Sequence, residues 1–232
     1  SPVFLVADGM GGHHLGGAAS AHAVGAFEDL VGRAFVTSRE FNKRLTRAAR
    51  SVAALGTGER APGSTLTGLL LSRQGALPCL RVVNIGDSRT YHLSTQSFSQ
   101  ITHDHSELQE LIDSGYLNRA QALESRKRNV ITRALGGYSG PVVGADVHLV
   151  PLNAGDRFLL CSDGLSDELD DEAIATVLAA GYTAQRTAEL LVAASLEGGG
   201  HDNTTAVVVD SAETPALAPA VVPGDASTQE VL

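Results

Sequence analysis

Four aspartates stand where apolar segments of the sequence end, and carboxylates in such places can bind divalent cations. They are Asp8 after the run 3–7, Asp87 after 82–86, Asp163 after 158–162 and Asp202 before 204–209. Any one of them alone could simply form a turn, because Asp-Gly and Gly-Asp pairs often do. Gathered at one end of a sheet, however, four carboxylates would repel each other unless cations bind between them. Oxygen ligands favour Mg²⁺ or Mn²⁺ over Zn²⁺, so the sequence predicts a magnesium or manganese centre.

Other catalytic patterns are absent from the sequence. His13 and His14 are adjacent, which does not direct both side chains to one metal, and no H-E-x-x-H helix motif occurs. No serine lies in a G-x-S-x-G elbow, and no glycine-rich segment continues into G-K-[ST]. His103 and His105 flank Asp104 and could titrate near neutrality or cap the helix that follows.

The composition limits the class of protein. With 232 residues and 43% hydrophobic content, the chain can bury a sizeable core, and we expect one main domain. A net charge of -9 argues against general nucleic-acid binding. No apolar run is as long as a membrane span, and no signal peptide is evident. Cys79 and Cys161 lie in apolar runs, which predicts buried free thiols and a reducing, cytoplasmic location.

Short strands dominate the middle of the chain, and helices are segregated towards its two ends. Alternating and β-branched segments predict strands at 3–7, 64–72, 77–85, 89–93, 98–102, 143–149, 158–161 and 204–209. Helical spacing predicts helices at 15–31, 40–55, 106–116, 118–125, 170–180 and 183–196. In the helix at 106–116, Leu108, Leu111 and Ile112 are expected to face inward. The class is therefore α+β, with a central antiparallel β sandwich flanked by helices on both sides (α-β-β-α layers).

Several of these segments, taken in order, resemble the motifs of the metal-dependent protein phosphatases (PPM, or type 2C), in their short bacterial form. The matching segments are VADGMGGH at 6–13, STLT at 64–67, NIGDSR at 84–89, ITRALG at 131–136, LCSDGL at 160–165 and GHDNTT at 200–205. The resemblance covers roughly residues 3 to 210. It implies a domain at 1–210 that hydrolyses phosphoserine and phosphothreonine in proteins. The Ala/Pro/Ser-rich composition of 211–232, which has no helical or strand period, predicts a disordered tail or linker there.

The resemblance also implies roles for individual residues. Asp8 would bridge two metal ions, the Gly9 carbonyl would bind one of them, and Asp163 and Asp202 would complete the second. Asp87 with Asp163 matches the position of a third, weaker ion. Asn203 would lie behind the ligands. The implied cofactors are thus two Mn²⁺ or Mg²⁺ ions, with a third in bacterial members.

The expected mechanism is attack on phosphorus by hydroxide held between the two ions, without a phosphoenzyme. Met10 stands where many eukaryotic members carry a histidine that is proposed as the general acid. Here a metal-bound water would have to protonate the leaving alkoxide, or His13 would help. In the segment from about 104 to 130, which corresponds to the family's flap, the basic run Arg126-Lys127-Arg128 could bind substrate or be a solvated turn.

One departure from the family concerns the first strand, which normally carries a phosphate-binding arginine and an acidic residue. Nothing before Val3 supplies either, so the domain at 1–210 is expected to lack this strand in the given sequence. Either phosphate binding is weakened and the sandwich lacks an edge strand, or residues before Ser1 supply both groups. We expect the second, because a chain seldom begins inside a strand. The expected partners are a bacterial serine/threonine kinase and its phosphorylated substrates, with the protein acting as a monomer and without nucleic acid or membrane. The alternative is a catalytically weak, phosphatase-like regulatory or binding module.

Overall fold

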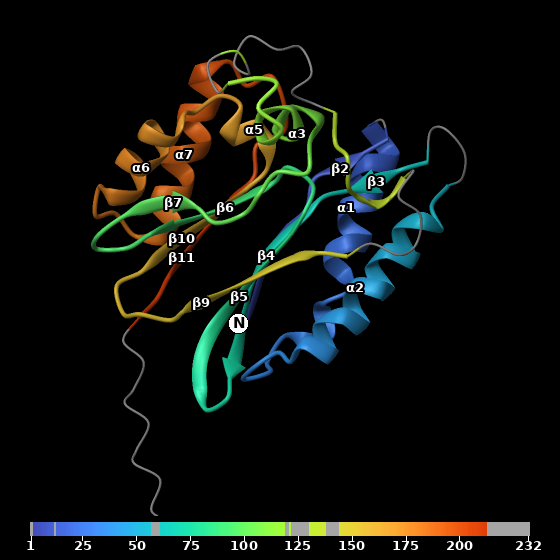
Figure 1. The fold of residues 1–232 in the computed structure, drawn as a ribbon, viewed down its shortest axis with the longest axis horizontal. Coiled ribbons are helices and arrows are strands. Elements are labelled where there is room, and N and C mark those ends of the chain that lie inside the picture. The colour runs from blue at the N-terminus through green and yellow to red at the C-terminus, as the bar shows by residue number, and fades with distance from the viewer. Residues whose placement is uncertain are drawn as a thin grey trace, which may run out of the picture.

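Two four-stranded antiparallel sheets pack against each other at the centre of the molecule (Figure 1). The structure is a computed structural model, and it describes residues 2–11, 13–56, 61–118, 121, 130–137 and 144–212. The first sheet has the order β1 (Val3–Val6), β4 (Leu66–Gln74), β5 (Leu77–Ile85) and β9 (Asp146–Pro151). The second has the order β11 (Ala206–Asp210), β10 (Arg157–Cys161), β6 (Arg89–Leu93) and β7 (Phe98–Gln100).

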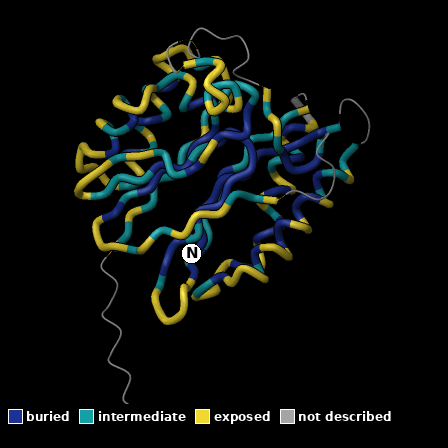
Figure 2. Tube along the Cα trace, in the orientation of Figure 1, coloured by how far each residue is buried: buried dark blue, intermediate teal, exposed yellow. Residues whose placement is uncertain are grey.

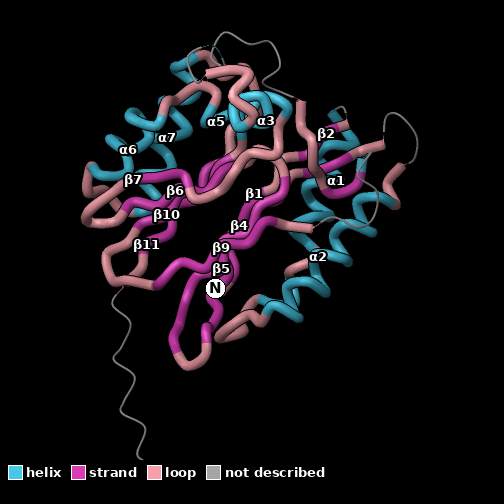
Figure 3. The backbone as a smooth tube through the Cα atoms, in the orientation of Figure 1, coloured by secondary structure: helices cyan, strands magenta, loops and turns pink. Residues whose placement is uncertain are grey.

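Helices cover the outer face of each sheet (Figure 3). The first sheet is covered by α1 (His13–Gly25) and α2 (Ser38–Ala53), and the second by α6 (Asp171–Ala179) and α7 (Ala184–Gly198). Shorter helices are η1 (Glu28–Leu30), α3 (Glu107–Asp113) and α5 (Asp163–Ser166). The predicted α+β class with helices on both sides of an antiparallel sandwich is confirmed.

Alternation along the strands divides the core into three layers, because successive side chains point to opposite faces of a sheet. On β10, Leu159 and Cys161 pack under α6 and α7, whereas Phe158 and Leu160 face the other sheet. The other sheet shows the same division: Val83 and Ile85 pack under α1 and α2, and Leu80 and Val82 lie between the sheets. Figure 2 shows these central strands as buried along most of their length.

Helix ends are fixed by local chemistry that the sequence carries. Thr37 forms a capping box with Glu40 at the start of α2. Asp170 and Thr183 cap α6 and α7 through their side chains. Gly115, with φ +73°, follows α3 in the left-handed conformation that ends many helices.

Some predicted boundaries are wrong. The helix expected at 15–31 begins two residues earlier and ends at Gly25, and a separate 3-10 turn at Glu28–Leu30 carries the buried Leu30 into the core. The strand expected at 64–72 breaks at Thr65, because β3 (Gly63–Ser64) leaves the main sheet to join β2 (Gly9–Met10) and β8 (Leu135–Gly136). This three-stranded sheet was not predicted, since two-residue strands have no period to detect.

Other differences are smaller. The strand expected at 143–149 is β9, and the last strand starts at Ala206, two residues later than predicted. In α3 no residue is fully buried, so its predicted inward face does not join the core. Most of the helix expected at 118–125 and nearly all of the tail expected at 211–232 lie outside the described residues.

Cys79 and Cys161 are free and buried, as predicted. Burial raises the pKa of the Cys161 thiol to about 12, so it stays protonated and unreactive. In the part of the chain that the structure describes, no helix is long and apolar enough to cross a membrane.

Candidate metal centre

The strand register brings three of the four aspartate-bearing turns to one end of the sandwich, and the fourth follows β1 at the same end. In the first sheet Val6 pairs with Thr67 and Leu66 pairs with Ile85, so Asp8 and Asp87 follow strands that finish together. In the second sheet Cys161 pairs with both Arg89 and Ala206, which aligns the turns that carry Asp87, Asp163 and Asp202. The turn 86–88 leads from β5 in the first sheet to β6 in the second, so Asp87 lies between the turns of the two sheets.

Asp8 and Asp163 are the two carboxyl groups that interact directly. Burial raises the pKa of Asp8, and the nearby charge of Asp202 adds to the rise, although the interaction with Asp163 opposes it. Burial and the charge of Asp8 raise the pKa of Asp163 as well. Oδ1 of Asp163 is buried and has no hydrogen-bond partner among the described residues. A buried oxygen without a partner is costly, and a cation would satisfy it.

Asp87 lies deeper than the other three aspartates, at 6% exposed. Burial and the charges of Asp163, Asp104 and Asp8 raise the pKa of Asp87 to about 8. Without a cation this carboxyl is therefore neutral at neutral pH, whereas a nearby divalent ion would favour its charged form.

Asp202 is exposed and its carboxylate accepts a hydrogen bond from the backbone N–H of Asn203 at 2.6 Å. Among the described residues, no three histidine, cysteine, aspartate or glutamate side chains are grouped closely enough to hold an ion. The predicted convergence is thus partial: Asp8 and Asp163 meet, Asp87 lies behind them, and Asp202 would have to turn towards them to bind the same ion.

The donor set nevertheless fits a divalent cation. It consists of carboxylate oxygens, one of them buried and unpartnered, with pKa values raised by burial and by each other. Hard oxygen donors of this kind suit Mg²⁺ and Mn²⁺. The assignment of Asp8, Gly9, Asp87, Asp163 and Asp202 as ligands remains a proposal.

Buried hydroxyl groups hold the backbone of Asp8 in place. The N–H of Asp8 donates to Oγ1 of Thr65 at 2.8 Å, and its carbonyl accepts from the N–H of Thr65 at 2.8 Å and from Oγ of Ser64 at 3.1 Å. Thr65 Oγ1 also lies 2.7 Å from Oγ of Ser88, the residue after Asp87. Thr65 and Ser88 therefore connect the two turns that carry Asp8 and Asp87, in a region where unsatisfied polar groups are costly.

Two glycines are required beside the aspartates by close backbone contact. A Cβ at Gly9 would collide with the carbonyl of Gly16 on α1, and a Cβ at Gly164 would collide with the carbonyl of Asn203. These contacts explain why glycine follows Asp8 and Asp163, beyond the turn preference that the sequence suggested.

A cavity of about 780 Å³ opens beside the centre. Its described lining includes acidic residues of several elements: Asp87, Asp104, Asp163, Asp167, Glu168, Asp170, Asp171 and Glu172. Among the described residues of the lining, the one base is Arg89, which donates hydrogen bonds to Asp104, the shortest at 2.6 Å. A phosphate dianion entering this cavity would meet net negative charge, so cations must neutralise the site before it can bind.

The two histidines beside Asp104 do not cap α3, because Ser106 is its N-cap. His103 pairs with Asp113 at 2.6 Å, on the surface. His105 is buried, and its Nδ1 accepts from the N–H of Gly86 at 3.0 Å while Nε2 pairs with Asp146. Burial lowers the pKa of His105 against the effect of Asp146, which keeps it neutral and able to accept at Nδ1. His105 thus holds the turn before Asp87.

Two other predicted groups cannot be placed. His13 begins α1, but its side chain lies outside the described part, and Arg126-Lys127-Arg128 lies outside it entirely. Asn203 is placed by its backbone, since its carbonyl accepts from Oγ of Ser162 at 3.1 Å. The sequence analysis missed Thr65 and Ser88, although hydroxyl residues inside apolar segments were a detectable signal.

Comparison with known proteins identifies the family. The family model for protein phosphatase 2C matches residues 1–198. The serine/threonine phosphatase stp of Listeria monocytogenes (strain F2365) is 30% identical over 218 residues, covering 90% of this chain and 84% of that protein. The serine/threonine protein phosphatase PstP of Mycobacterium tuberculosis is 35% identical over 217 residues, covering 90% of this chain and 40% of that longer protein.

Solved structures agree with the fold. The crystal structure of the M. tuberculosis phosphatase PstP/Ppp has a TM-score of 0.81 at 34% identity, covering 91% of this chain and 89% of that one. The catalytic domain of PstP in complex with two manganese ions has a TM-score of 0.79 at 34% identity, covering 91% and 88% of the two chains.

The layered fold with carboxylates at one end of its sandwich defines a metal-dependent hydrolase of the phosphatase type. This chain belongs to the protein phosphatase 2C family. The predicted family, the predicted enzyme class of serine/threonine protein phosphatase and the predicted divalent-metal dependence are confirmed.

Proposed function

We propose that this protein removes phosphate from phosphoserine and phosphothreonine side chains of proteins and so opposes a serine/threonine kinase. The observation that carries the proposal is the pair Asp8 and Asp163, two half-buried carboxyl groups in direct contact at the end of the sandwich, whose pKa values burial raises. The names and the manganese-bound structure of the relatives support it.

In this proposal Asp8, the Gly9 carbonyl, Asp163 and Asp202 hold two metal ions, and Asp87 with Asp163 holds a third. When bound, the metal pair makes water a nucleophile at neutral pH and neutralises the charge that develops on phosphoryl oxygens. The carboxylate and carbonyl oxygens of this donor set are ligands that a hard ion prefers, and Asp202, whose carboxylate now accepts from the N–H of Asn203, would have to turn towards the others to join them.

The chain's other residues position this set. Thr65 fixes the backbone of Asp8, and His105 fixes Gly86 before Asp87. The guanidinium of Arg89 forms an ion pair with Asp104. In this proposal Arg89 therefore stabilises the wall of the cavity and does not bind the phosphate of the substrate. Among the described residues that line the cavity, no other base competes for the phosphate with the metal ions.

The test is hydrolysis of a phosphothreonine peptide and of p-nitrophenyl phosphate, with Mn²⁺ or Mg²⁺ and with EDTA. We expect turnover with either ion, its loss in EDTA and its return when the metal is restored. Metal-independent turnover, or no turnover with saturating metal in a protein shown to be folded, would contradict the proposal.

A further inference from the structure

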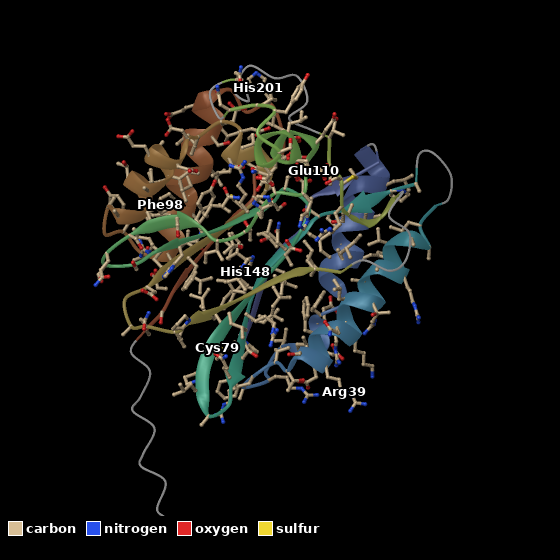
Figure 4. All side chains as sticks on the ribbon, in the orientation of Figure 1. Arg39, Cys79, Phe98, Glu110, His148 and His201 are labelled. Carbon is tan, nitrogen blue, oxygen red and sulfur yellow. The ribbon has the colours of Figure 1, made fainter. Side chains whose placement is uncertain are left out.

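The end of helix α7 lies beside two of the candidate metal-binding loops, and Ser195 connects it to both. Ser195 is fully buried in the last turns of the helix. Its carbonyl accepts the N–H groups of Gly199 and Gly200, the latter at 3.2 Å, and so starts the glycine-rich turn that leads to His201 and Asp202. Figure 4 labels His201 in this turn.

The side chain of Ser195 reaches the other loop. Oγ of Ser195 donates to the carbonyl of Gly164, the residue after Asp163, at 2.9 Å. It also lies 2.9 Å from Oγ1 of Thr204, which is itself 3.1 Å from the same carbonyl. The hydroxyl groups of Ser195 and Thr204 have two hydrogens for these three contacts. If one hydroxyl donates to the other, the second still donates to the carbonyl of Gly164. Thr204 follows Asp202 by two positions, so this hydroxyl pair ties the Asp163 turn to the Asp202 loop.

This use of a serine is unusual for its place in a helix. Serine and threonine inside helices usually return their hydrogen to a carbonyl one turn back. Thr187, fully buried on the same helix, does so with the carbonyl of Thr183 at 3.0 Å. Ser195 donates instead to a residue 31 positions away in the sequence.

The Asp202 loop depends on such contacts because Asp202 has little support of its own. Its carboxylate is exposed and accepts from the N–H of the next residue in the chain. Glu168 holds the same loop from the other side, with Oε1 2.7 Å from Nδ1 of His201. Cation binding requires carboxylate oxygens at about 2.0–2.6 Å from the ion, so a displaced loop loses the ligand.

We propose that Ser195 is a positioning residue for the candidate metal centre, because it fixes the spacing between the turn of Asp163 and the loop of Asp202. It acts through Gly164 and Thr204 and touches neither ion nor substrate. The inference rests on the proposed function only in taking these aspartates as the ligands.

The experiment measures Mn²⁺ binding by calorimetry and turnover with a phosphothreonine peptide, using the full chain. In Ser195→Ala we expect Mn²⁺ affinity to fall by about 10-fold to 100-fold, which is typical for groups that orient metal ligands. At saturating Mn²⁺, kcat returns to within a few-fold of the parent and KM is unchanged, because substrate contacts remain.

Thr187→Val is the matched control, since it removes a buried hydroxyl from the same helix without touching a metal loop. It is expected to lower the unfolding temperature in EDTA and to leave Mn²⁺ affinity at the parent value. Thr204→Ser keeps the second hydroxyl and is expected to keep Mn²⁺ affinity, whereas Thr204→Val is expected to weaken it.

Equal Mn²⁺ affinity in Ser195→Ala and the parent would overturn the inference and leave Ser195 a purely structural residue. If Ser195→Ala does not fold, the Thr204→Ser and Thr204→Val pair decides the question, and equal affinity in that pair overturns the inference. A parent that binds Mn²⁺ without hydrolysing the peptide contradicts the proposed function and leaves this test intact. A parent that binds no Mn²⁺ overturns both.

Discussion

At the scale of single residues, Asp163 is the side chain on which most of the site's electrostatics act. The charges of Asp8 and Asp202 raise the pKa of its carboxyl group, beyond the effect of burial. The charge of Asp163 in turn raises the pKa of Asp87. One of its oxygens is buried and has no partner among the described residues. An unpartnered buried oxygen lowers the stability of the metal-free protein, and a bound cation would remove that cost.

Asp163→Asn should therefore separate function from stability. We expect turnover at saturating Mn²⁺ to fall by more than about 100-fold, because a ligand is lost and even residues behind metal ligands matter by up to that factor. The unfolding temperature in EDTA should be unchanged or higher, since a buried charge conflict is removed. The measurements are kcat and thermal unfolding by circular dichroism.

Asp29→Asn is the control for neutralising a carboxylate elsewhere. Asp29 lies on the opposite helical layer, where its carboxylate pairs with Arg44. Its turnover should equal that of the parent. Activity of Asp163→Asn within a few-fold of the parent would refute the assignment of Asp163.

At the scale of elements, helix α1 sets the position of the Gly9 carbonyl. Gly16 on α1 and Gly9 on β2 touch through their backbones, and a Cβ on either would strike the carbonyl of the other. Gly17, the next residue of the helix, is exposed, and a Cβ there would have no atom within 4 Å beyond its own helix backbone. Of these two neighbouring glycines, packing requires Gly16 and does not require Gly17.

Alanine substitutions at these neighbours should give opposite results. Gly17→Ala should stabilise the protein by about 0.5–1 kcal/mol, because alanine has the higher helix propensity, with Mn²⁺ affinity unchanged. Gly16→Ala should lower both stability and Mn²⁺ affinity, because the helix must move away from the Gly9 carbonyl. Urea unfolding and Mn²⁺ calorimetry measure the two effects. Equal behaviour of the two variants would show that α1 does not place this carbonyl.

At the scale of the whole molecule, the buried carboxyl groups couple metal binding to folding. Asp87 keeps its proton in the folded protein up to about pH 8, whereas it loses that proton near its ordinary pKa of 3.8 when the chain unfolds. The unfolded state therefore binds fewer protons between those values, and stability falls as pH rises through this window. A bound cation would stabilise the charged form and oppose this loss.

The free energy of unfolding of the metal-free protein, measured by urea titration in EDTA, should thus decrease between about pH 4 and about pH 8. Asp87→Asn should reduce this dependence, of which a part remains because burial also raises the pKa values of Asp8 and Asp163. Excess Mn²⁺ should weaken it in the parent. His105 has the opposite effect, because burial lowers its pKa. Its contribution to stability therefore rises with pH below its ordinary pKa. The comparison between parent and variant removes that contribution. Identical pH profiles of the two proteins would exclude Asp87 as the source.

The sequence by itself determined the strands, most of the helices and the family. Short, nearly continuous apolar runs mark β4, β5 and β10, which are buried along most of their length. The helix caps at Thr37, Asp170 and Thr183 are local signals that need no distant partner. The aspartates were also found from local signals, because Asp8, Asp87 and Asp163 follow apolar runs and Asp202 precedes one.

Only the tertiary structure decided how those aspartates are held. The break at Thr65, the contact of Gly9 with Gly16 and the reach of Ser195 to Gly164 depend on neighbours that no local pattern identifies. No periodicity records such contacts, since they depend on which strands lie side by side and on how closely the backbones approach. The sequence thus contains the chemical groups of the site, and the packing of two sheets and their helices sets the distances between them.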